Sequence, residues 1–237
     1  MKVLVLGATG ATGSLVVQQL LNKKIETKII VRGTQKISKD LLNNKLLECI
    51  VGSISEFEQS KYLELISGCD SVISCLGHNV SFKGILGPPY KLVSNAVEKI
   101  VKAALLNNQK LKILLMSTTA FTNKKDGEQN TNGEKVIFSL LELLLPPHRD
   151  NILAGNYLLN KIENNSNIDW TAVRPDSLFN EEMVSAYEVV NNKTRSPIFD
   201  PGKTSRINVA HFMAELLVNE NLWNKWQFKM PVIYNKH

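Results

Sequence analysis

The sequence predicts an α/β fold of the Rossmann type, in which a doubly wound parallel β-sheet carries helices on both faces. Two observations support this fold class. Short β-branched and aliphatic runs alternate five times with helical patterns in the first half of the chain, as in sheets whose strands are joined by crossover helices. The first of these runs is also cut off by Gly7, Gly10 and Gly13, directly before a helical pattern.

The expected elements follow from these patterns in chain order. Pro88-Pro89 is expected to open the longest helix, whose apolar stripe runs from Leu92 to Leu105 and should lie against the sheet. The earlier helices are expected at residues 15–21 and 56–66, and the strands at residues 3–6, 27–31, 46–51, 71–76, 111–116 and 170–173.

The second half of the chain is less regular. A polar stretch at residues 122–133 is interpreted as a mobile surface loop. We expect helices at residues 134–145, at residues 150–164 and around Val209 to Leu217, a hairpin of residues 185–190 and 194–199, and a last strand at residues 231–234. The chain is predicted to be a single domain, with a core in residues 1–175 and a smaller pocket-forming region in residues 176–237.

The first thirteen residues, MKVLVLGATGATG, have the pattern of a buried strand, a tight turn and a helix. Such a turn brings backbone N–H groups at a helix N-terminus against an anion. Gly7 lets the chain turn, Gly10 lets a phosphate approach the backbone, and Gly13 lets the helix pack on the sheet. The spacing is GxxGxxG, and its position between strand and helix predicts a dinucleotide-binding site.

Arg32 ends the second expected strand, where an acidic residue would bind the adenosine ribose of NAD. A carboxylate would repel a 2′-phosphate, whereas a guanidinium binds one through paired, charged hydrogen bonds. Gly33, Thr34 and Lys36 follow Arg32. NADP(H) is therefore the expected cofactor, in preference to NAD(H).

Composition argues against several other classes of protein. The net charge is +6, from 28 basic and 22 acidic residues, but no long basic run is present, so no nucleic-acid partner is expected. Three cysteines without CxxC spacing predict neither disulfides nor a zinc site, and the spacing of His78, His148 and His211 predicts no metal. Apolar runs stay below the roughly 18 residues that span a bilayer, so we expect a cytoplasmic protein without membrane contact.

Several segments together resemble a known family. They are GATGATG from Gly7, VRGTQK from Val31, CDSVISCLG from Cys69, LLMSTTAF from Leu114 and DWTAVRP from Asp169. With these, the chain resembles the short-chain dehydrogenase/reductase superfamily, and within it the atypical NAD(P)H-binding members similar to NmrA-like proteins and biliverdin IXβ/flavin reductase. The resemblance covers most of the chain.

The resemblance implies a set of cofactor contacts. The glycine loop would contact the pyrophosphate, Arg32 the 2′-phosphate, and Ser53 with Ile54 the adenine. One departure weakens the adenine contact, because the family usually has Gly-Asp where this chain has Gly52-Ser53. The cofactor-binding residues implied in this way are Gly7, Thr9, Gly10, Ala11, Thr12, Gly13, Arg32, Ser53, Ile54, Cys75, Leu76, Gly77, Ser117, Lys161 and Pro175.

Tyr157 and Lys161 have the YxxxK spacing and share one face of an expected helix. In the larger superfamily such a tyrosine transfers the substrate proton, while the lysine lowers its pKa and holds the nicotinamide ribose. Thr118, or its neighbours Ser117 and Thr119, would bind the substrate oxygen. His148 is a rival acid, although a surface position beside a helix cap formed by Asp150 is an alternative interpretation.

These features predict an NADP(H)-dependent reductase of a small carbonyl, quinone or flavin-like acceptor. An NmrA-like redox sensor that binds NADP(H) without turnover is the main alternative, with the 122–133 loop reporting occupancy. An epimerase or dehydratase with tightly held NAD is a third, which Arg32 disfavours. The acceptor and the oligomeric state do not follow from the sequence.

Overall fold

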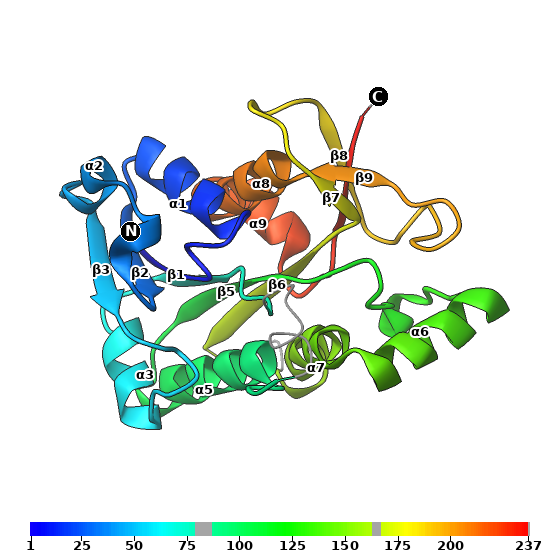
Figure 1. Cartoon of the computed structure of the whole chain (residues 1–237), viewed down its shortest axis with the longest axis horizontal. Helices are drawn as coiled ribbons and strands as arrows, with labels where there is room; N and C mark the ends of the chain where they lie inside the picture. Colours follow the sequence, from blue (N-terminus) through cyan, green and yellow to red (C-terminus); the bar gives the residue numbers. More distant parts are fainter. Residues whose placement is uncertain (79–86, 163–166, 237) are drawn as a thin grey trace.

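A parallel sheet dominates the structure, a computed structural model that describes residues 1–78, 87–162 and 167–236. Eight strands follow the order β3-β2-β1-β4-β5-β6-β10-β8, and the neighbours run parallel except for β8, which is antiparallel to β10. The predicted fold class is confirmed (Figure 1). The strands are β1 (Lys2–Leu6), β2 (Glu26–Val31), β3 (Leu47–Val51), β4 (Ser71–Ser74), β5 (Leu111–Met116), β6 (Ile168–Pro175), β8 (Tyr187–Val190) and β10 (Val232–Asn235).

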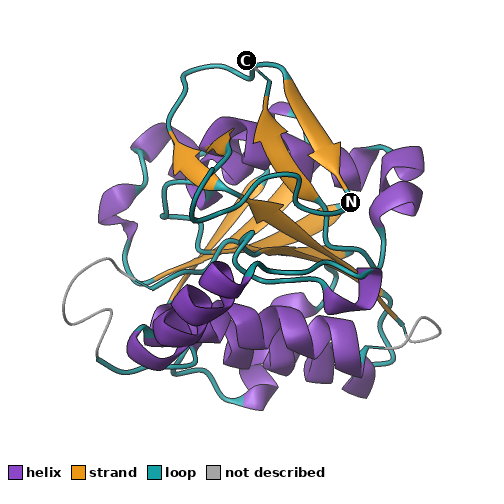
Figure 2. Cartoon of the chain, turned by 90° about the vertical axis from the view of Figure 1, so that its right-hand side faces the viewer, coloured by secondary structure: helices purple, strands orange, loops and turns teal. Residues whose placement is uncertain are grey.

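Helices cover both faces of the sheet (Figure 2). One face carries α1 (Gly13–Asn22) packed against α8 (Arg206–Val218), which in turn contacts α9 (Glu220–Trp226). The other face carries α3 (Gln59–Ile66), α5 (Leu92–Leu106) and α7 (Pro146–Lys161) side by side. The described residues also form the short helix α2 (Lys39–Leu42), α6 (Asn132–Leu144), two 3-10 turns at Thr34–Lys36 and Lys124–Asp126, and a separate parallel pair of β7 (Ser177–Phe179) with β9 (Lys203–Ser205).

Two hydrophobic clusters lie on opposite faces of the sheet. Alternate residues of β1 take part in each, with Leu4 and Leu6 in one and Val3 and Val5 in the other. All four side chains are buried, as expected for a strand covered by helices on both sides. None of the helices in the described chain has the length and apolarity needed to cross a bilayer.

The expected hairpin of residues 185–199 is wrong. Its first half is β8, but this strand pairs with β10 at the edge of the main sheet. Residues 194–199 form a turn instead of a second strand, because the Ser196 hydroxyl accepts the backbone N–H groups of Ile198 and Phe199. A local side-chain hydrogen bond has here replaced a strand ladder.

Two helices begin elsewhere than expected. Helix α7 begins at Pro146, since proline at the first helical positions costs no hydrogen bond. The prolines that were expected to end one helix therefore open the next. Helix α5 begins at Leu92 instead of Pro88, and residues 163–166, into which α7 was expected to extend, lie outside the described residues.

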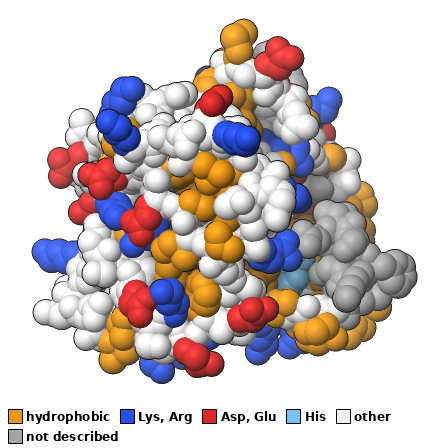
Figure 3. All heavy atoms as spheres, turned by 60° about the vertical axis from the view of Figure 1, so that its left-hand side comes forward, with side chains coloured by type: hydrophobic (Ala, Val, Ile, Leu, Met, Phe, Trp, Pro, Cys, Tyr) orange, Lys and Arg blue, Asp and Glu red, His pale blue; other side chains and the backbone are white. Residues whose placement is uncertain are grey.

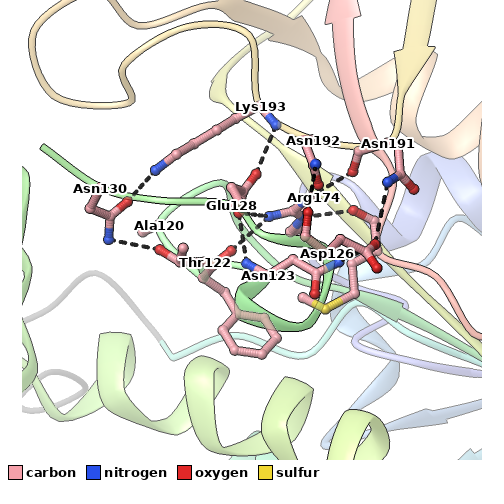
Figure 4. A network of polar contacts seen from close by, with 12 residues as sticks. Ala120, Thr122, Asn123, Asp126, Glu128, Asn130, Arg174, Asn191, Asn192 and Lys193 are labelled. Atoms are coloured by element: carbon pink, nitrogen blue, oxygen red, sulfur yellow. Dashed lines mark hydrogen bonds and ion pairs between the residues drawn. The ribbon is translucent and has the colours of Figure 1, made fainter.

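The interpretation of residues 122–133 as a surface loop holds for the exposed residues 124–127 but is wrong for two side chains. Asn123 and Glu128 are buried, and Glu128 forms an ion pair of 2.7 Å with Arg174 of β6. Figure 4 shows these two side chains pointing toward each other from different segments. The loop also contacts the chain after β8, because Glu128 accepts the backbone N–H of Lys193 at 2.8 Å. A buried ion pair therefore fixes this polar segment to the sheet.

Candidate functional site

A cleft of about 720 Å³ opens at the carboxyl ends of β1 to β5. The strand order reverses between β1 and β4, and open α/β sheets bind ligands at such a reversal. The described residues that line the cleft are Leu6, Gly7, Thr9, Gly10, Ala11, Thr12, Ile30, Val31, Arg32, Lys36, Gly52, Ser53, Ile54, Ser55, Cys75, Leu76, Gly77, His78, Gly87, Pro88, Pro89, Leu92, Met116, Leu178 and Arg206.

The glycine loop is shaped by close backbone packing. Gly7 has φ of 76°, and a Cβ there would lie 2.4 Å from the carbonyl oxygen of Cys75. A Cβ at Gly13 would lie 2.1 Å from the carbonyl oxygen of Gly7. Only glycine fits either position, and as a result the loop stays flat against β4 and the first turn of α1. No side chain caps α1 and its first turn holds no acidic residue, so this helix end is suited to an anion.

The charged side chains around the cleft are all basic. Arg32 and Lys36 lie at the end of β2, and Arg206 lies at the start of α8. No carboxylate is present among the described lining residues. Elsewhere the charges are mixed: on the face turned forward in Figure 3, Lys and Arg side chains are interspersed with Asp and Glu. The cleft therefore combines a phosphate-binding backbone with local positive charge, which fits a dinucleotide.

Most of the implied cofactor residues line this cleft together. They are Gly7, Thr9, Gly10, Ala11, Thr12, Arg32, Ser53, Ile54, Cys75, Leu76 and Gly77. Burial in the hydrophobic cluster that packs on α1 and α8 raises the pKa of Cys75 to about 12, so its thiol is uncharged. Gly13 does not line the cleft; it packs against the backbone of Gly7. Ser117, Lys161 and Pro175 do not line the cleft.

The three residues expected to act in catalysis do not line the cleft either. Tyr157 packs against the hydrophobic cluster between α5 and α7. Burial and the nearby Glu98 carboxylate raise its pKa, whereas a proton-transferring tyrosine needs a neighbouring cation that lowers it. Lys161 is exposed at the end of α7, and the Thr118 hydroxyl accepts the backbone N–H of Ala120 at 3.2 Å. The three are not brought together at the cleft, and a catalytic role for them stays a prediction.

A polar cluster of His78, Asp150 and Ser94, whose pairing the sequence does not predict, lies at the cleft wall. Asp150 of α7 is fully buried, and its Oδ2 lies 2.9 Å from Nε2 of His78. The same carboxylate accepts the backbone N–H groups of Val93 and Ser94 at 2.7 and 3.0 Å, and the Ser94 hydroxyl at 2.5 Å. Asp150 thus caps α5 from another helix, and the interpretation of it as a cap of its own helix is wrong. His78 and Asp150 are 72 positions apart, so no local sequence pattern predicts that they meet.

Replacing Asp150 with alanine is expected to lower the free energy of unfolding by about 2 kcal/mol, at the upper end for a helix cap. The substitution leaves two buried backbone N–H groups of α5 without their acceptor. Chemical denaturation followed by tryptophan fluorescence measures the change. Ser38→Ala is the matched control, because Ser38 caps the exposed, four-residue helix α2. Equal stability of Asp150→Ala and the wild type would contradict the assigned cap.

Comparisons with solved structures agree with this fold. A short-chain dehydrogenase/reductase from Veillonella parvula, in complex with NADP, is 17% identical with a TM-score of 0.71, covering 99% of this chain and 94% of that one. An oxidoreductase from Lactococcus lactis is 16% identical with a TM-score of 0.70, covering 100% and 91%. An anaerobillin reductase from Escherichia coli O157:H7 is 16% identical with a TM-score of 0.68, covering 99% and 97%.

No curated protein matches the sequence closely enough to count as a relative. The structural similarities above are too low in sequence identity to show more than the shared fold. The model of a family described as NAD(P)H-binding matches residues 7–220, from the glycine loop to the start of α9. This chain therefore belongs to this NAD(P)H-binding family.

Proposed function

We propose that this protein is an NADP(H)-dependent reductase of a small carbonyl, quinone or flavin-like acceptor. The observation that carries the cofactor preference is the charge of the cleft, which has Arg32, Lys36 and Arg206 and no carboxylate among its described lining residues. A 2′-phosphate adds negative charge that such a site favours, and an acidic residue at the end of β2 would disfavour it.

Each part of the cleft has a binding task in this proposal. The glycine loop donates backbone N–H groups to the pyrophosphate, and Arg32 with Lys36 binds the 2′-phosphate. Ser53 and Ile54 flank the adenine, and the chain from Cys75 to Gly77 passes beneath a ribose. When bound, the cofactor supplies the hydride, while the protein orients it against the acceptor. Met116 and Leu178 add apolar side chains to the lining of the cleft.

Replacing Arg32 with alanine is expected to abolish a preference for NADPH over NADH of at least about tenfold, or about 1.4 kcal/mol. The guanidinium contributes charged hydrogen bonds to the 2′-phosphate, which NADH lacks. Fluorescence titration of wild type and variant with both nucleotides measures the two dissociation constants. Lys39→Ala is the matched control, since it removes a nearby exposed charge that does not line the cleft.

The titration also separates the competing functions. Failure of both nucleotides to bind would overturn the cofactor site and the reductase with it. An unchanged NADPH preference in Arg32→Ala would overturn the role of Arg32. Tight NADPH binding without oxidation by any acceptor would favour the redox sensor. One argument for the redox sensor no longer applies. The 122–133 loop was expected to report cofactor occupancy, but the buried Arg174–Glu128 ion pair holds it against the sheet.

A further inference from the structure

His78 differs from the other ionisable side chains that line the described part of the cleft. The others are the guanidinium groups of Arg32 and Arg206, the amine of Lys36, and the Cys75 thiol, whose pKa burial raises to about 12. Histidine is the residue type that exchanges a proton near neutral pH. The reduction of a carbonyl needs such a group, since a hydride alone leaves a negative charge on oxygen.

The position of His78 suits this task. It follows β4 by four residues, at the strand reversal where the cleft opens, and its side chain is 5% exposed. Its Nε2 is held by the fully buried Asp150 at 2.9 Å, and among the contacts of the described residues no hydrogen bond occupies Nδ1, the nitrogen that would face an acceptor. A carboxylate bound to one imidazole nitrogen fixes the ring's orientation.

Asp150 is itself rigidly placed. Three hydrogen bonds from Val93 and Ser94 hold both of its carboxylate oxygens at the start of α5. The His78–Asp150 pair therefore connects the cleft wall to helices α5 and α7. Asp150 therefore contacts the cleft through His78 and the start of α5 through Val93 and Ser94.

We propose that His78 donates the proton that the acceptor's oxygen takes up during reduction, and that Asp150 positions its imidazole; this inference rests on the proposed reductase function. In this step the acceptor's carbonyl carbon receives the hydride that bound NADPH supplies, and a C–H bond forms. The electron pair of the C=O π bond moves to oxygen, which takes the proton from Nδ1 of the protonated imidazole. An O–H bond forms, NADP⁺ and neutral His78 remain, and the ring regains its proton from water.

The first test compares wild type with His78→Gln in single-turnover oxidation of bound NADPH by 4-nitrobenzaldehyde. We expect the rate to fall at least about 100-fold, within the range for loss of a general acid, while the dissociation constant for NADPH changes less than about twofold. With 9,10-phenanthrenequinone as the acceptor, the rate should fall less in His78→Gln. The reduced quinone is a much weaker base than an alkoxide, so it depends less on a proton donor. His211→Gln is the matched control, since His211 bonds to Tyr187 and does not line the cleft.

A second readout does not depend on turnover. The ring resonances of His78, assigned by their absence in His78→Gln, should shift when NADPH is added, and those of His211 should not. In Asp150→Asn the amide faces Nε2, so the proton of the neutral ring should move to Nδ1, as nitrogen-15 NMR can detect. With 4-nitrobenzaldehyde this variant should lose kcat with little change in KM. If Asp150→Asn does not fold, His78→Gln still decides the matter, because that substitution leaves the α5 cap in place.

Several results would overturn the proposal. A His78→Gln rate within threefold of wild type would do so, as would a loss confined to Tyr157→Phe. If the ring resonances of His78 do not shift when NADPH is added, His78 does not lie next to the bound cofactor. NADPH binding by the wild type without reduction of either probe would overturn the proton transfer and leave the cofactor site standing. Absence of NADPH binding would instead show that the proposed function itself has failed.

Discussion

Replacing Glu128 with alanine is expected to lower the free energy of unfolding by about 3–5 kcal/mol, the cost of breaking a buried ion pair from one side. The Arg174 side chain is fully buried and that of Glu128 is 3% exposed. The guanidinium also donates to the carbonyl oxygens of Phe121, Met230 and Asn191. These bonds hold it in place, so in the variant its charge stays buried without a counter-ion.

The loss should appear in urea denaturation as a lower midpoint, and in thermal unfolding as a fall in Tm of roughly 6–20 °C. Glu64→Ala provides the comparison, because Glu64 pairs with Lys61 on the exposed side of α3. Exposed ion pairs contribute little, so the unfolding midpoint of this control should match that of the wild type. Similar stabilities for Glu128→Ala and Glu64→Ala would refute the structural role of the buried pair.

Replacing Gly13 with alanine is expected to weaken NADPH binding at least about 100-fold, or about 2.7 kcal/mol. A Cβ at Gly13 would lie 2.1 Å from the carbonyl oxygen and 2.8 Å from the carbonyl carbon of Gly7. Both obstacles are backbone atoms, so the whole turn must move away from α1. The movement displaces the N–H groups that are proposed to bind the pyrophosphate.

Fluorescence titration with NADPH, together with chemical denaturation, separates lost binding from lost stability. Gly68→Ala is the control: Gly68 has φ of 70°, a Cβ added there would meet nothing within 4 Å, and the residue lies at the end of α3 away from the cleft. It should lose about 1–2 kcal/mol of stability through backbone strain and keep its affinity for NADPH. Unaltered NADPH binding by Gly13→Ala would show that the loop does not hold the cofactor.

The cleft lining from Gly7 to Lys36 was largely predictable from sequence because it is local. Gly7 to Gly13 form one turn, and Arg32 follows the next strand at a distance that the βαβ unit dictates. The family match agrees with this prediction as far as NAD(P)H binding. Lys36 lies beside Arg32 in the sequence and in the cleft, for the same reason.

The surroundings of Tyr157, Lys161 and the polar stretch at residues 122–133 could not be predicted in this way. The YxxxK pattern placed Tyr157 and Lys161 on one helix face, but spacing along a helix does not say what that face contacts. In the fold Tyr157 packs against the hydrophobic cluster beside α5. Similarly, the polar composition of residues 122–133 indicated exposure, although Glu128 finds its buried partner on a strand 46 residues away.

By itself the sequence determined the fold class, the glycine turn and the basic residue at the end of β2, because hydrophobic periodicity and backbone sterics act over a few residues. Only the tertiary structure decided which distant polar groups meet. His78 and Asp150 are 72 positions apart, and they come together because β4 ends and α7 begins at the same edge of the sheet. The physical reason is that a buried charge needs a partner, and the fold selects that partner by proximity in space.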